Sequence, residues 1–113
     1  MGIAPGLNYA GSPVRVGAHF EDDDGDDIDP TTITFTLRSP QRVETSYVYG
    51  TDEEITKSSE GDYFAEVTPD EGGRWLYAWS STGTNRTIRF EGSFIVQASE
   101  FDAYVGTWGG DYA

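Results

Sequence analysis

The chain has 113 residues, a length typical of one domain, and it contains no cysteine, so disulfide bonds cannot stabilise it. Twenty acidic residues against seven basic ones give a net charge of −13, which argues against nucleic acid or an anionic membrane as a partner. No apolar run approaches the roughly 18 residues that cross a bilayer, so we expect no membrane partner.

Residues 1–12 are rich in glycine, alanine, asparagine and proline and show no period, so they predict an N-terminal arm. Residues 1–11 lack the basic start and the apolar stretch of a secretory signal. We therefore expect the protein to be made in a cytoplasm and not to be exported by the general secretory route. The arm offers three larger side chains for contact with a partner: Ile3, Leu7 and Tyr9.

Apolar and polar residues alternate over residues 14–20, and again more clearly over residues 32–38, which is the pattern of half-buried strands. Between them, residues 21–29 carry seven acids around a glycine, so this segment predicts an exposed turn. The Asp29-Pro30 pair ends the turn, because a residue before proline favours extended geometry. We expect the two strands to pair as an antiparallel hairpin with a long acidic loop.

Further strands are predicted where alternation resumes after each turn signal. They span residues 43–49, 63–67, 74–80 and 87–96, with a possible short edge strand at 51–57. No segment reads as a helix of useful length. Six or seven short strands separated by regular turns predict an all-β fold, a β-sandwich or small barrel, over residues 13–97.

The aromatic fraction, 14%, is high, and rings recur in phase along the predicted strands. A platform for stacking on sugars is one interpretation of the set Trp75, Tyr77, Trp79, Tyr47, Tyr49 and Tyr63. Alternation on adjacent strands favours the other interpretation, a core built from large rings. The expected core aromatics are Phe20, Phe35, Tyr63, Trp75, Tyr77, Trp79, Phe90 and Phe94.

Residues 98–113 form a glycine-rich tail that is too apolar for a typical disordered end and too rich in glycine for a good strand. Because no strand pattern buries its rings, we expect a C-terminal arm that contacts a neighbouring subunit. The candidate contact residues are Phe101, Tyr104, Trp108 and Tyr112.

The acidic loop raises the possibility of a calcium site, because Asp22, Asp24 and Asp26 alternate as they do at the start of some calcium loops. An EF-hand loop needs glycine at its sixth position and glutamate at its twelfth, which are Asp27 and Ile33 here. The EF-hand pattern therefore fails. A looser calcium site at the three aspartates and a simple solvated loop both remain open.

Signals for catalysis are absent from the sequence. His19 is the only histidine and falls on the polar face of its strand, where a solvated or cross-strand role is the simpler interpretation. The chain has no cysteine nucleophile, no glycine-rich phosphate loop and no zinc-ligand spacing. We expect a protein without catalytic residues and without a cofactor.

Several segments, in order, resemble small immunoglobulin-like virion proteins of tailed bacteriophages and prophages. They are Phe-Glu-Asp-Asp-Asp-Gly at 20–25, Asp-Pro-Thr-Thr-Ile-Thr at 29–34, Tyr-Val-Tyr-Gly at 47–50, Gly-Asp-Tyr at 61–63, Gly-Arg-Trp-Leu-Tyr-Ala-Trp at 73–79 followed by Ser-Thr-Gly at 81–83, and Glu-Gly-Ser-Phe-Ile-Val at 91–96. The resemblance covers about residues 13–97. It implies an immunoglobulin-like β-sandwich of six to seven antiparallel strands with no catalytic residues to carry over.

The resemblance also implies a place in the virus particle. Such domains often decorate the outside of the head, where the partners are the major capsid protein, other virion proteins or neighbouring copies of the same chain. A head–tail connector, neck or tail component is an alternative within the same class. A carbohydrate-binding immunoglobulin-like adhesion module is an alternative from another class.

Overall fold

The computed structural model describes residues 8–83 and 87–98, and within these ranges every regular element is a β-strand. The eight strands are β1 (Asn8–Tyr9), β2 (Val14–His19), β3 (Thr32–Arg38), β4 (Glu44–Val48), β5 (Ile55–Ser59), β6 (Asp62–Val67), β7 (Gly73–Thr82) and β8 (Ile88–Gln97). The prediction of an all-β fold is confirmed. The described residues contain no helix of the length and apolar character needed to cross a membrane.

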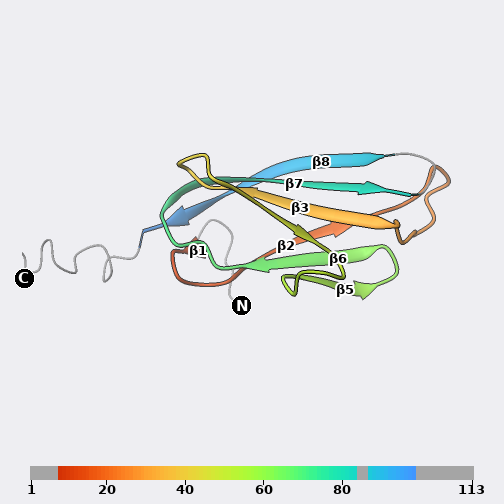
Figure 1. Cartoon of the computed structure of the whole chain (residues 1–113), viewed down its shortest axis with the longest axis horizontal. Coiled ribbons are helices and arrows are strands. Elements are labelled where there is room, and N and C mark those ends of the chain that lie inside the picture. Colours follow the sequence, from red (N-terminus) through yellow and green to blue (C-terminus); the bar gives the residue numbers. More distant parts are fainter. Residues whose placement is uncertain (1–7, 84–86, 99–113) are drawn as a thin grey trace, which may run out of the picture.

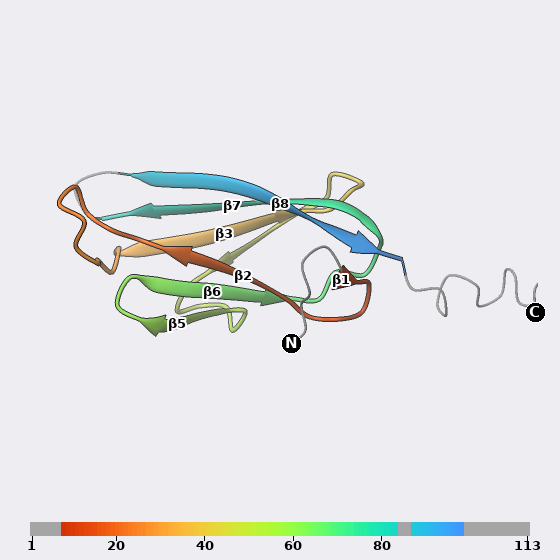
Figure 2. The same cartoon turned by 180° about the vertical axis from the view of Figure 1, so that it is seen from behind.

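The strands form two sheets in a β-sandwich-like arrangement. The larger sheet has the order β1-β8-β7-β3-β4, and the smaller has the order β2-β6-β5. Figure 1 shows β8, β7 and β3 in one layer and β2, β6 and β5 in the other, and Figure 2 shows the same two layers from behind. In Figure 1, β4 runs diagonally from the β3 layer toward β5, so the larger sheet curls at this edge.

The predicted hairpin between the first two long strands is wrong. β2 pairs with β6 in the smaller sheet, with Val14 opposite Val67, whereas β3 pairs with β4 and β7 in the larger sheet. The acidic loop therefore crosses from one sheet to the other. A loop of this length does not force its flanking strands to pair, and alternation identifies a strand without identifying its partner.

The core fills the space between the inner faces of the two sheets. Its buried apolar members are Val14, Val16, Phe20, Ile33, Phe35, Leu37, Ile55, Tyr63, Ala65, Val67, Trp75, Trp79 and Val96. The larger sheet contributes the largest rings, and Trp79 and Phe35 are fully buried with ring centroids 4.8 Å apart. Tilted ring pairs at this separation add stabilisation to the area that each ring buries.

Residues 8–12, which the sequence assigns to an arm, are attached to the body. β1 pairs in parallel with the end of β8, with Asn8 opposite Val96. The Ala10 N–H donates to Gln97 O at 2.9 Å, and the Gly11 N–H donates to Pro69 O at 2.8 Å. The pattern does not reveal this strand because two residues are too few to show alternation. Residues 1–7, the remainder of the predicted arm, lie outside the described ranges.

Candidate docking surface

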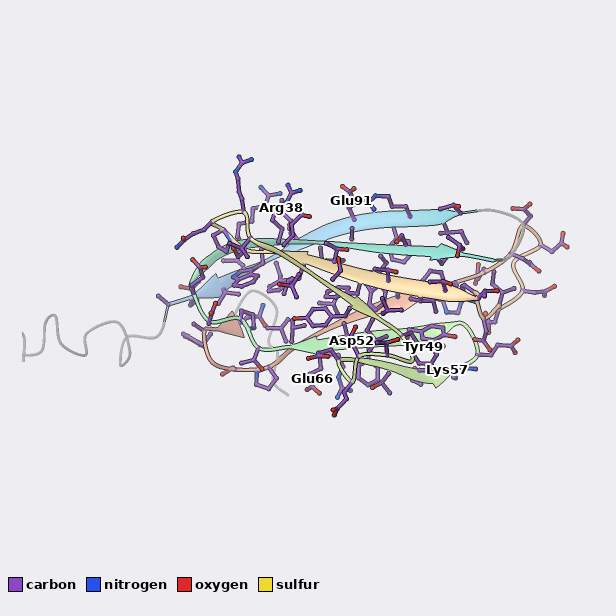
Figure 3. All side chains as sticks on the ribbon, viewed as in Figure 1. Arg38, Tyr49, Asp52, Lys57, Glu66 and Glu91 are labelled. Carbon is purple, nitrogen blue, oxygen red and sulfur yellow. The ribbon has the colours of Figure 1, made fainter. Side chains whose placement is uncertain are left out.

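A hollow lined by three arginines lies on the outer face of the larger sheet, at the end where β3 turns into β4. The hollow has a volume of about 310 Å³ and is lined by Arg38, Ser39, Pro40, Arg42, Arg74 and Leu76. We call these six residues the arginine hollow. Figure 3 shows Arg38 directed away from the smaller sheet, on the opposite side of the body from Glu66. Three of the chain's seven basic residues thus converge on one place.

Strand pairing explains why the arginine hollow forms. Arg38 at the end of β3 is opposite Leu76 of β7, and Arg74 of β7 is opposite Ile95 of β8. Arginine therefore alternates with an apolar residue across neighbouring strands of the outer face. Leu76 and Ile95 are among the few large apolar side chains that the described chain exposes. Basic groups around an exposed apolar centre are typical of protein-binding surfaces, where arginine is enriched.

Two of the three arginines have no carboxylate to neutralise them. Within residues 8–83 and 87–98, Arg42 and Arg74 make no ion pair. The other described basic residues each contact an acid: Arg15 contacts Glu66, Arg38 contacts Glu44, Lys57 contacts Asp29, and Arg89 contacts Glu91. In a chain with twenty acids, two unpaired guanidinium groups beside one hollow leave a local positive charge. Such a site attracts carboxylate or other anionic groups.

The backbone at Arg42 is strained. Its φ is 69°, and it is the only residue other than glycine with positive φ among the described residues. The Arg42 N–H donates to Ser39 O at 2.8 Å, so it closes the tight turn between β3 and β4. Glycine is the usual residue at such a left-handed position, where a side chain costs about 1–2 kcal/mol. Arginine at this position therefore lowers the stability of the turn relative to glycine.

The predicted core aromatics lie on the inner faces of the sheets. Phe20, Phe35, Tyr63, Trp75 and Trp79 are buried, and Tyr77, Phe90 and Phe94 are partly buried against the same core. Tyr47 is also partly buried there, and Tyr49 packs edge-on against Tyr63. Tyr63, Trp75 and Trp79 are therefore unavailable for stacking on a sugar, whereas Tyr49 is 41% exposed.

Most of the predicted arm contacts lie outside the described residues, namely Ile3, Leu7, Phe101, Tyr104, Trp108 and Tyr112. Tyr9 is described and is half exposed at the edge of the larger sheet, in β1. Its ring is thus fixed to the sandwich rather than carried on a separate arm.

The three aspartates of the candidate calcium site come together at the tip of the acidic loop. The carboxylate oxygens of Asp22, Asp24 and Asp26 lie within 4.8 Å of one another. One oxygen of Asp22 already accepts the backbone N–H groups of Asp24 and Asp26, each at 2.9 Å. These hydrogen bonds explain the position of Asp22 in structural terms, because an aspartate side chain often accepts backbone N–H groups in such turns.

Sequence reasoning missed the arginine hollow. Arg38 and Arg42 are close in the chain, on either side of the Ser39-Pro40 turn signal, but Arg74 is far from both. Bringing them together requires the β3–β7 register, which alternation alone does not give. The spacing of Arg38 and Arg42 around a predicted turn was the one available signal.

The comparison with known proteins does not assign this chain to a family. Neither a family model nor a curated protein matches this chain.

Proposed function

We propose that this chain is a non-enzymatic structural protein of a tailed-phage particle, an immunoglobulin-like domain that decorates the outer surface of the head. In this proposal the partner is the major capsid protein or another virion protein. The protein is made in the host bacterial cytoplasm and resides in the virion. The arginine hollow is the observation that carries the proposed binding mode, and the resemblance described above suggests the kind of particle.

The strand order supports the immunoglobulin-like part of the proposal. Immunoglobulin sandwiches place strands B, E and D in one sheet and strands G, F and C in the other, and some add strand C′ beyond C. If β2 corresponds to strand B, then β6 and β5 correspond to strands E and D, and the smaller sheet has the order B-E-D. On the same count, β8, β7, β3 and β4 become G, F, C and C′ of the larger sheet.

The charge distribution supports docking through the arginine hollow. Most of the molecule carries negative charge and would be repelled by an acidic surface. The arginine hollow is the place where Arg42 and Arg74 can receive carboxylates from a partner while Leu76 is covered by an apolar side chain. We therefore propose an acidic segment of a capsid subunit as the occupant.

Sedimentation tests the docking mode. Particles that lack this protein are mixed with the purified chain, and the bound fraction is measured after centrifugation. The double variant R42G/R74E should bind at least about tenfold more weakly than wild type, and wild-type binding should weaken as salt rises. Arg15→Glu is the matched control, because Arg15 is an exposed arginine of the smaller sheet.

The variant Arg42→Gly separates binding from folding. It removes a strained side chain, so we expect its thermal stability to equal or slightly exceed that of wild type while binding falls. Equal binding by wild type and R42G/R74E, or equal loss in R15E, contradicts docking through the arginine hollow.

A connector, neck or tail component remains the alternative within the same class, and copy number per particle separates it from a decoration protein. The carbohydrate-binding alternative loses the support of Trp75 and Trp79, because these rings are buried in the core. Quenching of tryptophan fluorescence by added polysaccharide would support the carbohydrate-binding alternative.

A further inference from the structure

The chain's single histidine lies among carboxylates at the end of the body opposite the arginine hollow. His19 ends β2 and pairs with Asp62, the first residue of β6. An isolated bridge between Glu21 and Asp27 brings both ends of the acidic loop to the same place. In Figure 1 this loop, in orange, and the turn between β3 and β4, in gold, are at opposite ends of the sandwich. The fold thus gathers four side chains that the sequence separates.

The orientation of the His19 ring is fixed from one side. Nδ1 lies 2.5 Å from Oδ1 of Asp62. The other carboxylate oxygen of Asp62 accepts a hydrogen bond from Ser59 Oγ at 2.8 Å. A carboxylate that holds one ring nitrogen in this way selects the tautomer and aims the other nitrogen outward. This arrangement is the usual support of a metal-binding histidine.

The outward nitrogen faces two anions. Nε2 of His19 lies 3.0 Å from Oε2 of Glu21 and 3.0 Å from Oδ1 of Asp27. A single N–H can be directed at only one of these oxygens, and a bare lone pair is repelled by both. A positive charge between Nε2 and the two carboxylates is therefore favourable.

The distances also suit a small divalent cation. Bonds of about 2.0–2.1 Å from Zn²⁺ to nitrogen and oxygen place neighbouring tetrahedral ligands about 3.3 Å apart. The two separations of 3.0 Å from Nε2 of His19 to Glu21 and Asp27 are a few tenths of an ångström shorter. All three candidate ligand atoms lie within 4.8 Å of one another. A small outward shift of the two carboxylates would open room for the ion.

We propose that His19, Glu21 and Asp27 form a binding site for a divalent transition-metal ion of the Zn²⁺ class, with Asp62 as the positioning residue. One imidazole nitrogen and two carboxylate oxygens suit Zn²⁺, whereas Ca²⁺ takes all-oxygen shells. The three side chains are 43–49% exposed, so a further coordination position faces solvent. The bound ion would tie the acidic loop to the end of β2.

Titration of the full chain with ZnCl₂ tests this site. Isothermal calorimetry and elemental analysis after gel filtration should give one Zn²⁺ per chain. H19Q should abolish this binding, and E21Q and D27N should each weaken it. D62N should weaken it by about 10- to 100-fold, the usual effect of losing the group that holds a metal-ligating histidine. Near-ultraviolet circular dichroism of each variant shows whether it keeps the wild-type fold.

Asp24→Asn is the matched control, because Asp24 belongs to the same acidic loop but not to the proposed site. It should bind Zn²⁺ as wild type does. The imidazole nitrogen resonances of His19 should shift on addition of Zn²⁺ in wild type and in D24N alike. Absence of stoichiometric binding, equal loss in H19Q and D24N, or a preference for Ca²⁺ that H19Q leaves unchanged would overturn the proposal.

Discussion

The ring of Tyr77 lies directly over Gly92 of the neighbouring strand. The two residues are register partners in the β7–β8 pair. A Cβ atom at position 92 would lie 2.3 Å from the Tyr77 hydroxyl oxygen and 2.5 Å from the ring carbon that bears it. The same ring stacks against Phe35 and Phe94, with centroids 5.9 and 6.4 Å away. Glycine at 92 therefore makes the space that this ring occupies.

We predict that Gly92→Ala lowers the free energy of unfolding by about 1–3 kcal/mol, because the added methyl group displaces a packed ring. In a Tyr77→Ala background, the same substitution should cost much less. Urea denaturation of the wild type, both single variants and the double variant measures this coupling. Additive effects of the two substitutions would show that the ring does not depend on the glycine.

Ser81 gives a prediction of opposite sign. Its side chain is 1% exposed, and its hydroxyl oxygen has no hydrogen-bond partner. A buried unpaired hydroxyl destabilises the folded state, so Ser81→Ala should raise the free energy of unfolding by about 1 kcal/mol. Ser80→Ala, at the preceding and less buried position of β7, should change the free energy of unfolding little. A loss of stability in S81A larger than that in S80A would contradict the assignment.

Asp29 should contribute stability that acid removes. Its carboxylate accepts hydrogen bonds from Lys57 Nζ at 2.7 Å, from the Gly61 N–H at 2.9 Å and from the Tyr63 hydroxyl at 2.9 Å. These contacts, with that of Lys57 the strongest, lower the pKa of Asp29 to about 2. Since the pKa in the unfolded chain is about 3.9, the folded state binds fewer protons over this range.

The contribution of Asp29 is therefore present above about pH 4 and is lost as the pH falls toward about 2. We predict that Asp29→Asn melts at a lower temperature than wild type at pH 7, and that the difference shrinks between pH 4 and pH 2. Asp70→Asn changes an exposed aspartate and should melt as wild type does. A difference between wild type and D29N that stays constant with pH would contradict the role of the charge.

The local pattern of the sequence predicts the strands well and their partners poorly. The stretch 32–38 reads as a strand because alternation and β-branched residues agree, and β3 has the same bounds. Partner choice between β2 and β3 depends on long-range packing of both inner faces, which the pattern of either strand does not contain. The two-residue β1 is fixed by its pairing with β8, and Gly11, which follows β1, donates a hydrogen bond to Pro69 O in the loop before β7. No local pattern in the sequence predicts this strand.

The candidate sites likewise combine residues that stand out in the sequence with neighbours that do not. Single residues are visible in the sequence, such as the lone His19 and the dense acidic loop. Their chemistry depends on neighbours that only the fold supplies. Asp62 reaches His19 through the β2–β6 register, and Arg74 reaches Arg38 through the β3–β7 pair. Sequence reasoning therefore singled out His19 and the acidic loop, but it did not identify Asp62 as the partner of His19 and did not identify the three arginines of the hollow.

A count of this polypeptide in purified virus particles tests the proposed function most directly. Quantitative mass spectrometry against the major capsid protein gives the ratio. We predict a ratio of about one or a simple fraction of it, because a decoration protein follows the symmetric repeat of the head lattice. A handful of copies per particle would instead indicate a neck or tail component. Absence from the particles would contradict the account.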